Sequence, residues 1–271
     1  MPQLLPCPLL KLLTQYLMSF VPHLHRLGLG LLVWGCLFMP AQANELSVAV
    51  AANFAAPMQK LAVMFEQSSG HKIKLAVGST GRFYAQIKNG APFEVLLAAD
   101  DETPRKLAQE GLAISSTQMT YAVGRLALWS KQPALVDDKG EVLAKGQFDK
   151  LALADPKLAP YGLAAIETLT QLGHLERLRP KLVQAENIAQ AYQFVSTHNA
   201  PLGLVALSQI YQDGKFTEGS AWVVPAHLHS PIRQDAIVLN KGKDNPATAS
   251  LLVFLRSDQA RALIKRYGYE F

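Results

Sequence analysis

Short apolar runs alternate along most of the chain with segments in which apolar residues recur at helical spacing. Leu46–Val50 predicts a buried strand. After it, Phe54, Met58 and Leu61 lie on one face of a predicted helix, and Gly70 predicts where that helix ends. This alternation of strand and helix is typical of layered α/β proteins.

The same criteria predict the remaining elements. We expect further strands at Lys72–Val77, Phe93–Ala98, Tyr121–Trp129, Leu151–Ala154, Leu202–Ala206 and Asp235–Leu239. We expect further helices at Arg82–Asn89, Glu102–Glu110, Tyr161–Leu172 and Asn187–Thr197, and two more at the end of the chain.

The length and order of these elements predict an α/β fold of two lobes. Lobe 1 would comprise residues 44–124 and 230–271, and lobe 2 residues 125–229. The chain would cross between the lobes twice, near Tyr121–Trp129 and near Arg233–Leu239. Such an arrangement leaves a cleft between the lobes, where ligands tend to bind.

The first 43 residues have the pattern of a secretory signal peptide. Arg26 precedes the uncharged, mostly apolar run Leu27–Met39, and Ala41-Gln42-Ala43 follows it as a cleavage site. The run is shorter than the roughly 20 residues that a membrane-spanning helix needs. Counted from Met18, the leader has an ordinary length, so we expect translation to start there and the mature protein to be periplasmic.

Both cysteines, Cys7 and Cys36, fall within this leader, which excludes disulfides and thiolate metal sites from the mature chain. The segment Val33-Trp34-Gly35-Cys36 resembles a lipoprotein cleavage box, but Trp34 suits it poorly, so we do not expect a lipid anchor.

Composition argues against nucleic acid as a partner. The formal net charge of the whole chain is +5, and without Lys11 and Arg26 of the leader it falls to +3. No Lys/Arg cluster is interleaved with aromatic residues, as a nucleic-acid surface would require.

Two strand-to-helix junctions carry hydrogen-bond donors and no charge. One is Val48–Phe54, with Asn53, and the other is Leu75–Gly81, with Ser79 and Thr80. A helix N-terminus offers unpaired N–H groups and a partial positive charge, so it attracts anions. The pair predicts a protein that holds a small oxyanion without salt bridges.

Lobe 2 supplies two similar junctions. Ala154–Gly162 leads into a helix with Pro160 in its first turn, and Asn187 is a predicted N-cap of the next helix. Four helix N-termini could therefore converge on the cleft. Taken singly, each is more typical of an ordinary helix cap or tight turn than of a ligand site, and Tyr161 is more typical of packing than of a donor. Only the combination of secretion, two lobes and four uncharged junctions favours an anion site.

Other classes of function are less well supported. A secreted α/β hydrolase would need a Gly-x-Ser-x-Gly elbow, and a phosphate-binding enzyme a Walker loop, and the sequence has neither. His227 and His229 would need a third ligand to bind a metal, and their Pro-flanked segment is more typical of a solvated loop. The leader, and the lack of a DNA-binding segment, argue against a ligand-sensing regulator. We therefore expect a binding protein and not an enzyme.

An ordered set of short motifs spans nearly the whole mature chain: Ala51-Ala52-Asn53-Phe54, Gly78-Ser79-Thr80-Gly81, Tyr84-Ala85-Gln86-Ile87, Asn89-Gly90-Ala91-Pro92, Ala98-Ala99-Asp100, Ala159-Pro160-Tyr161-Gly162, Pro201–Ala206 and Lys265–Tyr269. This set resembles one known family, the periplasmic molybdate-binding proteins of molybdate ABC transporters.

The resemblance implies a type II periplasmic binding protein that captures molybdate, and also tungstate, and delivers it to a membrane ABC permease. It implies a monomer without a cofactor, in which molybdenum is bound as the oxyanion and no free metal cation is held. Carried over from the family, the residues that hold the anion through neutral donors are Ala52, Asn53, Ser79, Thr80, Tyr161 and Ile188. Asn53 would donate from both its backbone and its side chain.

Two departures from the family pattern affect this site. Many members have a hydroxyl residue where this chain has Ala52. Another branch has a tyrosine at the position of Ala206 and a small residue at that of Tyr161, so here a tyrosine hydroxyl would approach from a different helix. A protein for another oxyanion, such as sulfate, is the alternative within this class.

Overall fold

The computed structural model of the protein describes residues 44–271. The predicted signal peptide, the start at Met18 and both cysteines lie outside the described residues. Over the part of the chain that is described, none of the helices has the length and apolar character needed to cross a membrane.

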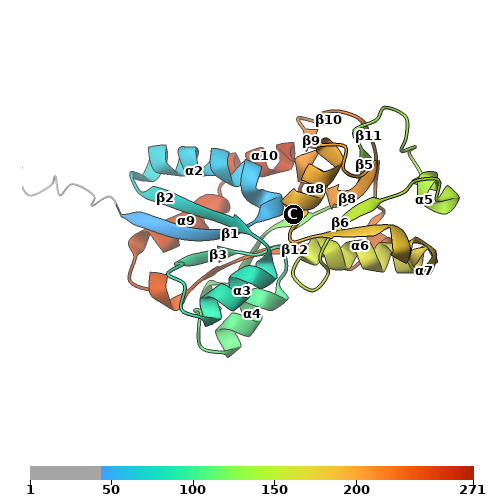
Figure 1. Ribbon diagram of the computed structural model, residues 1–271. Helices are drawn as coiled ribbons and strands as arrows, with labels where there is room; N and C mark the ends of the chain where they lie inside the picture. Colours follow the sequence, from blue (N-terminus) through green and yellow to red (C-terminus); the bar gives the residue numbers. More distant parts are fainter. Residues whose placement is uncertain (1–43) are drawn as a thin grey trace, which may run out of the picture. The chain divides into compact units, whose positions relative to one another are not determined.

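A first sheet, with strand order β2-β1-β3-β12-β4, forms the core of lobe 1 (Figure 1). Its strands are β1 (Glu45–Ala51), β2 (Lys72–Gly78), β3 (Val95–Leu97), β4 (Met119–Gly124) and β12 (Ile232–Val238). Strand β1 pairs in parallel with β2 and β3, whereas β12 pairs antiparallel with β3 and β4. The parallel strands therefore end at one edge of the sheet.

Helices cover both faces of this sheet, which is why β1 is apolar at nearly every position. Val48 and Val50 pack against α2 (Ala55–Ser69), α9 (Pro246–Leu255) and α10 (Asp258–Arg266). Between them, Ala49 points to the opposite face. That face is covered by α3 (Thr80–Lys88) and α4 (Glu102–Gln109).

A second sheet, with strand order β11-β5-β8-β6-β7, forms the core of lobe 2. Its strands are β5 (Leu126–Ser130), β6 (Leu151–Ala154), β7 (Leu182–Ala185), β8 (Leu202–Ala206) and β11 (Ser220–Val223). Strand β6 is parallel to β7 and β8, and β5 is antiparallel to β8 and β11.

Two longer helices accompany this second sheet, α6 (Pro160–Gln171) and α8 (Ile188–Ser196). Leu169 of α6 packs with the apolar side chains of one sheet face, and Val195 of α8 with those of the other. The smaller elements are α5 (Glu141–Lys145), α7 (Leu175–Leu178), the hairpin β9 (Tyr211–Gln212) and β10 (Lys215–Phe216), and six 3-10 turns in residues 44–271 that include η1 (Ala52–Phe54) and η4 (Leu207–Gln209).

The predicted strand Tyr121–Trp129 was wrong in one respect. It consists of β4 and β5, which belong to different sheets and are separated at Arg125. The apolar pattern runs through this break because both strands are buried, and periodicity does not reveal which sheet a strand joins. The strands β7 and β11 were not predicted.

The chain passes from the first sheet to the second between β4 and β5 and returns between β11 and β12. These are the two crossovers of the predicted two-lobed fold. We keep the residue limits of the lobes, 44–124 with 230–271 and 125–229, as a proposal.

The core of lobe 1 gives a test of stability. Leu61 on α2 is fully buried, so Leu61→Ala should lower the free energy of unfolding by about 2–5 kcal/mol through lost burial and a cavity. Val63 on the same helix is 55% exposed, so Val63→Ala should change it by less than about 0.5 kcal/mol. Urea denaturation of both variants measures the difference, and equal effects would contradict this packing.

Candidate functional site

Four strand-to-helix junctions lie at the carboxyl ends of parallel strands. In lobe 1 the register pairs Ala51, the last residue of β1, with Gly78, the last residue of β2. In lobe 2 it pairs Ala154 with Ala185, the last residues of β6 and β7. Because paired strands end side by side, the helices that follow them begin side by side, at the edge where α/β proteins bind ligands.

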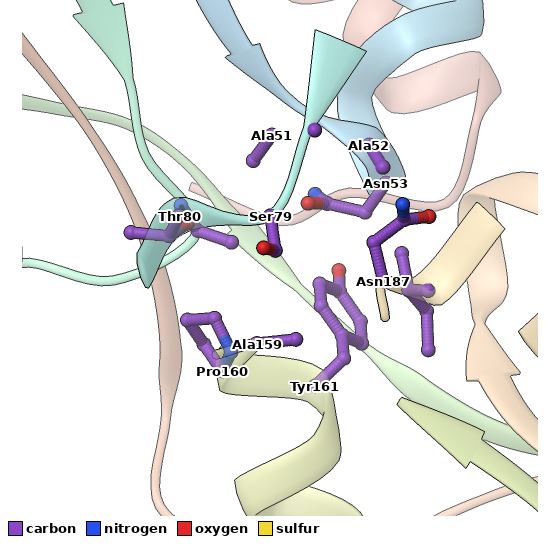
Figure 2. A pocket seen from close by; sticks show the side chains of 12 residues that line it. Ala51, Ala52, Asn53, Ser79, Thr80, Ala159, Pro160, Tyr161 and Asn187 are labelled. Carbon is purple, nitrogen blue, oxygen red and sulfur yellow. Dashed lines mark hydrogen bonds between the residues drawn. The ribbon is translucent and has the colours of Figure 1, made fainter. Parts of the chain in front are cut away.

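One small cavity, of about 10 Å³, lies among these junctions (Figure 2). Its volume is close to what one buried water needs. The twelve lining residues come from both lobes, and they include all six predicted site residues: Ala51, Ala52, Asn53, Gly78, Ser79, Thr80, Ala99, Ala159, Pro160, Tyr161, Asn187 and Ile188.

Two hydroxyls at this cavity have no hydrogen-bond partner. Among residues 44–271, the Ser79 and Tyr161 hydroxyls are the buried side-chain polar atoms that lack one. Figure 2 shows the two side chains entering the cavity from different elements. An unsatisfied buried polar group costs about 1–3 kcal/mol, so two that share one cavity indicate a missing acceptor.

Both hydroxyls can act as donors at neutral pH. Burial raises the pKa of Tyr161 well above its ordinary value, so the phenol keeps its proton. Tyr269 and Asn53 lie close enough to perturb that pKa, although neither forms a hydrogen bond of ordinary geometry with the Tyr161 hydroxyl in the described part of the chain. The Tyr161 hydroxyl also packs against Gly124, at the crossover between the lobes, where any Cβ would collide with it.

Helix N-termini supply backbone donors around the same cavity. Thr80 is the first residue of α3, Ile188 the first of α8, and Tyr161 the second of α6 after Pro160, which has no N–H. The first N–H groups of a helix have no partner inside it, and the helix dipole adds partial positive charge there. Asn187 caps α8 by accepting hydrogen bonds from two backbone N–H groups of the first turn.

The Asn53 side chain is already engaged. Its Nδ2 donates to Gln234 Oε1 at 2.6 Å and to the Tyr269 hydroxyl at 2.9 Å. A carboxamide nitrogen has two hydrogens, so these two bonds use both. Only the backbone N–H of Asn53 is left to donate at the cavity, where the sequence suggested both groups. Thr80 keeps its donor, because its Oγ1 accepts from the Ala99 N–H at 3.0 Å.

None of the cavity-lining residues that the structure describes is acidic or basic. Asp155 accepts from the Lys157 N–H and Glu186 pairs with Arg82, so both carboxylates are used outside the cavity, as expected. Asp100 lies in a neighbouring crevice between the lobes, and burial raises its pKa to about 6.

Two contacts join the lobes beside the cavity. The Gly81 N–H of α3 donates to the Leu158 carbonyl at 2.9 Å, and Arg82 pairs with Glu186. A Cβ on Gly81 would lie 3.0 Å from Leu158 Cα, so the close approach of the two backbones depends on glycine. Both contacts therefore link the two lobes beside the cavity.

His227 and His229 lie in a segment without a third metal ligand. Residues 44–271 contain no group of three or more His, Cys, Asp or Glu side chains that could hold a metal ion. What sequence reasoning missed is the buried polar cluster around Asn53, formed by Ser208, Gln234 and Tyr269. Gln234 stands in the polar run Arg233-Gln234-Asp235 of β12, so no local pattern marked it as buried.

Comparison with known proteins agrees with this architecture. The family described as bacterial extracellular solute-binding protein matches residues 46–270. The solved structure of the Azotobacter vinelandii periplasmic molybdate-binding protein is similar, with a TM-score of 0.81 and 38% sequence identity, over 83% of this chain and 99% of the other.

Two curated relatives carry the name molybdate-binding protein ModA. The one from Azotobacter vinelandii is 56% identical over 235 residues, which are 87% of this chain and 93% of the relative. The one from Rhodobacter capsulatus is 49% identical over 233 residues, or 86% and 91% of the two chains. The chain therefore belongs to the bacterial extracellular solute-binding proteins and, among them, to the ModA family of molybdate-binding proteins.

Proposed function

We propose that this protein captures molybdate, and also tungstate, in the periplasm and delivers it to a membrane ABC permease. The observation that carries the proposal is the pair of unsatisfied hydroxyls, Ser79 and Tyr161, in an uncharged cavity at four helix N-termini. Every oxygen of a fully deprotonated oxyanion can accept a hydrogen bond, and none can donate one. Such an ion would therefore supply the acceptors that these donors lack. The relatives that are 56% and 49% identical are named molybdate-binding proteins, and these names indicate that the oxyanion is molybdate.

The energetics are adequate without a positive side chain. The proposed donors are the hydroxyls of Ser79 and Tyr161 and the backbone N–H groups of Asn53, Thr80 and Ile188, with Ala52 and Tyr161 N–H nearby. Each hydrogen bond to a charged acceptor contributes about 1.5–3 kcal/mol. Five such bonds contribute about 8–15 kcal/mol, which spans the roughly 8–12 kcal/mol of micromolar to nanomolar binding, and the two further N–H groups would offset closure costs.

Selectivity would follow from cavity size and from the lack of an acceptor. Sulfate is smaller than molybdate and would be held loosely by donors set for longer bonds. Phosphate carries a proton at neutral pH and needs an acceptor such as Asp, and the lining residues include no carboxylate. The cavity is smaller than a tetrahedral oxyanion, so the lobes must part to admit the ion and close around it.

Titration calorimetry of residues 44–271 with sodium molybdate, tungstate, sulfate and phosphate tests the function. We expect nanomolar to micromolar binding of molybdate and tungstate, and binding of sulfate at least about a thousandfold weaker, a difference of roughly 4 kcal/mol. Equal affinities for molybdate and sulfate would refute the selectivity. Native mass spectrometry of protein from molybdate-grown cells would show whether the dianion co-purifies.

Tyr161→Phe separates binding from stability. It removes one donor to the anion, so molybdate affinity should fall about 10- to 150-fold. The hydroxyl has no partner within the described protein, so its removal relieves the cost of an unsatisfied buried group, and ligand-free stability should rise by up to about 3 kcal/mol. Tyr192→Phe, on a tyrosine that stacks on Trp129 in lobe 2, is the control. Wild-type affinity in Tyr161→Phe would limit Tyr161 to its backbone and packing.

Gly81→Ala should move stability and affinity in opposite directions. Alanine favours the helix α3 by up to about 1 kcal/mol relative to glycine, so ligand-free stability should rise slightly. The added Cβ would crowd Leu158 across the lobes, so molybdate affinity should fall about tenfold, within the usual cost of overpacking. Thermal unfolding and calorimetry measure the two effects, and unchanged affinity would show that this contact is not needed for closure.

A further inference from the structure

The 3-10 turn Leu207–Gln209, which we call the bracing turn, contacts both halves of the candidate site. The Ser208 hydroxyl donates to the Asn53 carbonyl of lobe 1 at 2.8 Å. The adjacent Gln209 donates from Nε2 to the Ile188 carbonyl of lobe 2 at 3.1 Å. Neither side chain lines the cavity, yet each holds a residue that does.

On the lobe 1 side, the hydrogen bonds form a closed ring. Asn53 Nδ2 donates to the Tyr269 hydroxyl at 2.9 Å, and Ser208 donates to the Asn53 carbonyl at 2.8 Å. The Tyr269 hydroxyl lies 2.9 Å from the same Asn53 carbonyl and 3.1 Å from Ser208 Oγ, so its proton has an acceptor in either direction and every donor in the ring is satisfied. Burial raises the pKa of Tyr269 to about 12, so its donor proton is retained at neutral pH.

Gln234 determines which atoms of this ring donate and which accept. Its Nε2 donates to the Ile232 carbonyl at 3.0 Å, which can only accept. Its Oε1 must then face Asn53, and Asn53 must present its NH₂ group in return. Gln234 also stands at the register shift between β12 and β4, and bulges of this kind re-aim side chains.

The end of the chain anchors the ring beside a crossover. Glu270 exchanges two backbone hydrogen bonds with Val123 of β4, at 2.7 and 2.9 Å. Gly268, at φ +79°, lets the chain pass close to Leu207, where a Cβ would lie 2.8 Å from the leucine Cδ2. Tyr269 is therefore held between the crossover strand and the bracing turn.

From this geometry we infer that Ser208 and Gln209, with Tyr269, are positioning residues that set the distance between Asn53 and Ile188 and thereby the size of oxyanion that the site prefers. The inference rests on the proposed function and deepens it. Asn53 acts on the ion through its backbone N–H, and its side chain acts as a brace. Because Ser208 reaches Asn53 across the lobes, the brace is complete only when the lobes are together.

Calorimetry of Ser208→Ala and Tyr269→Phe with molybdate and with sulfate tests this inference. Molybdate affinity should fall about tenfold in each variant, the effect of one lost hydrogen bond. Sulfate has shorter bonds and would already be held loosely by donors set for molybdate, so its affinity should fall less than about threefold. The ratio of molybdate affinity to sulfate affinity should therefore decrease. The losses in the double variant should not add, because the two hydroxyls contact each other and share the Asn53 carbonyl.

Tyr267→Phe and Ser196→Ala are the controls, since neither residue belongs to the ring, and both should keep the wild-type preference. Gln209→Met keeps the size of the side chain and removes the donor to Ile188, so it should also lower the ratio of molybdate affinity to sulfate affinity. Because Gln209 lies outside the ring, this variant tests the inference even if a ring variant fails to fold. Unchanged molybdate affinity, or equal losses for molybdate and sulfate, would overturn the positioning role. Failure of the wild-type protein to bind molybdate would instead overturn the proposed function.

Discussion

Buried donors without acceptors are the constraint around which the described structure is organised. A helix begins with N–H groups that it cannot satisfy itself, and a protein normally exposes them to water or caps them. Here several helix starts face one cavity, and the two buried hydroxyls without partners in residues 44–271 face it too. In the function proposed above, this cost would be recovered when an acceptor binds, so the same donors would supply the affinity.

Neutral donors also determine how such a site can discriminate. A positive side chain attracts any anion, whereas a ring of fixed N–H and O–H groups rewards an ion whose oxygens match the donor positions. That reward depends on rigidity, because donors that can follow the ion accept several sizes equally well. The ring of Asn53, Tyr269 and Ser208, together with Gln209 on the other side, supplies rigidity around the cavity.

The two sheets make the convergence possible. Parallel pairing of β1 with β2, and of β6 with β7, places two helix starts side by side in each lobe. The crossovers after Gly124 and before β12 then bring the two pairs to one cavity, and Gly124 has no side chain to displace the Tyr161 hydroxyl. Different parts of the structure therefore stabilise the fold and shape the candidate site. Apolar layers stabilise each sheet, and polar contacts between the lobes shape the site.

The sequence by itself determined the α/β alternation, most helix and strand positions and the four uncharged junctions, because hydrophobic periodicity and cap residues are local signals. The motif resemblance led to Ala52, Asn53, Ser79, Thr80, Tyr161 and Ile188, and all six line one cavity. Only the tertiary structure decided that Tyr121–Trp129 is divided between two strands, β4 and β5, and that the Asn53 carboxamide is occupied. It also brought Ser208, Gln234 and Tyr269 together. Their hydrogen bonds to Asn53 join residues more than 150 positions apart, and no local pattern encodes which distant donor meets which acceptor.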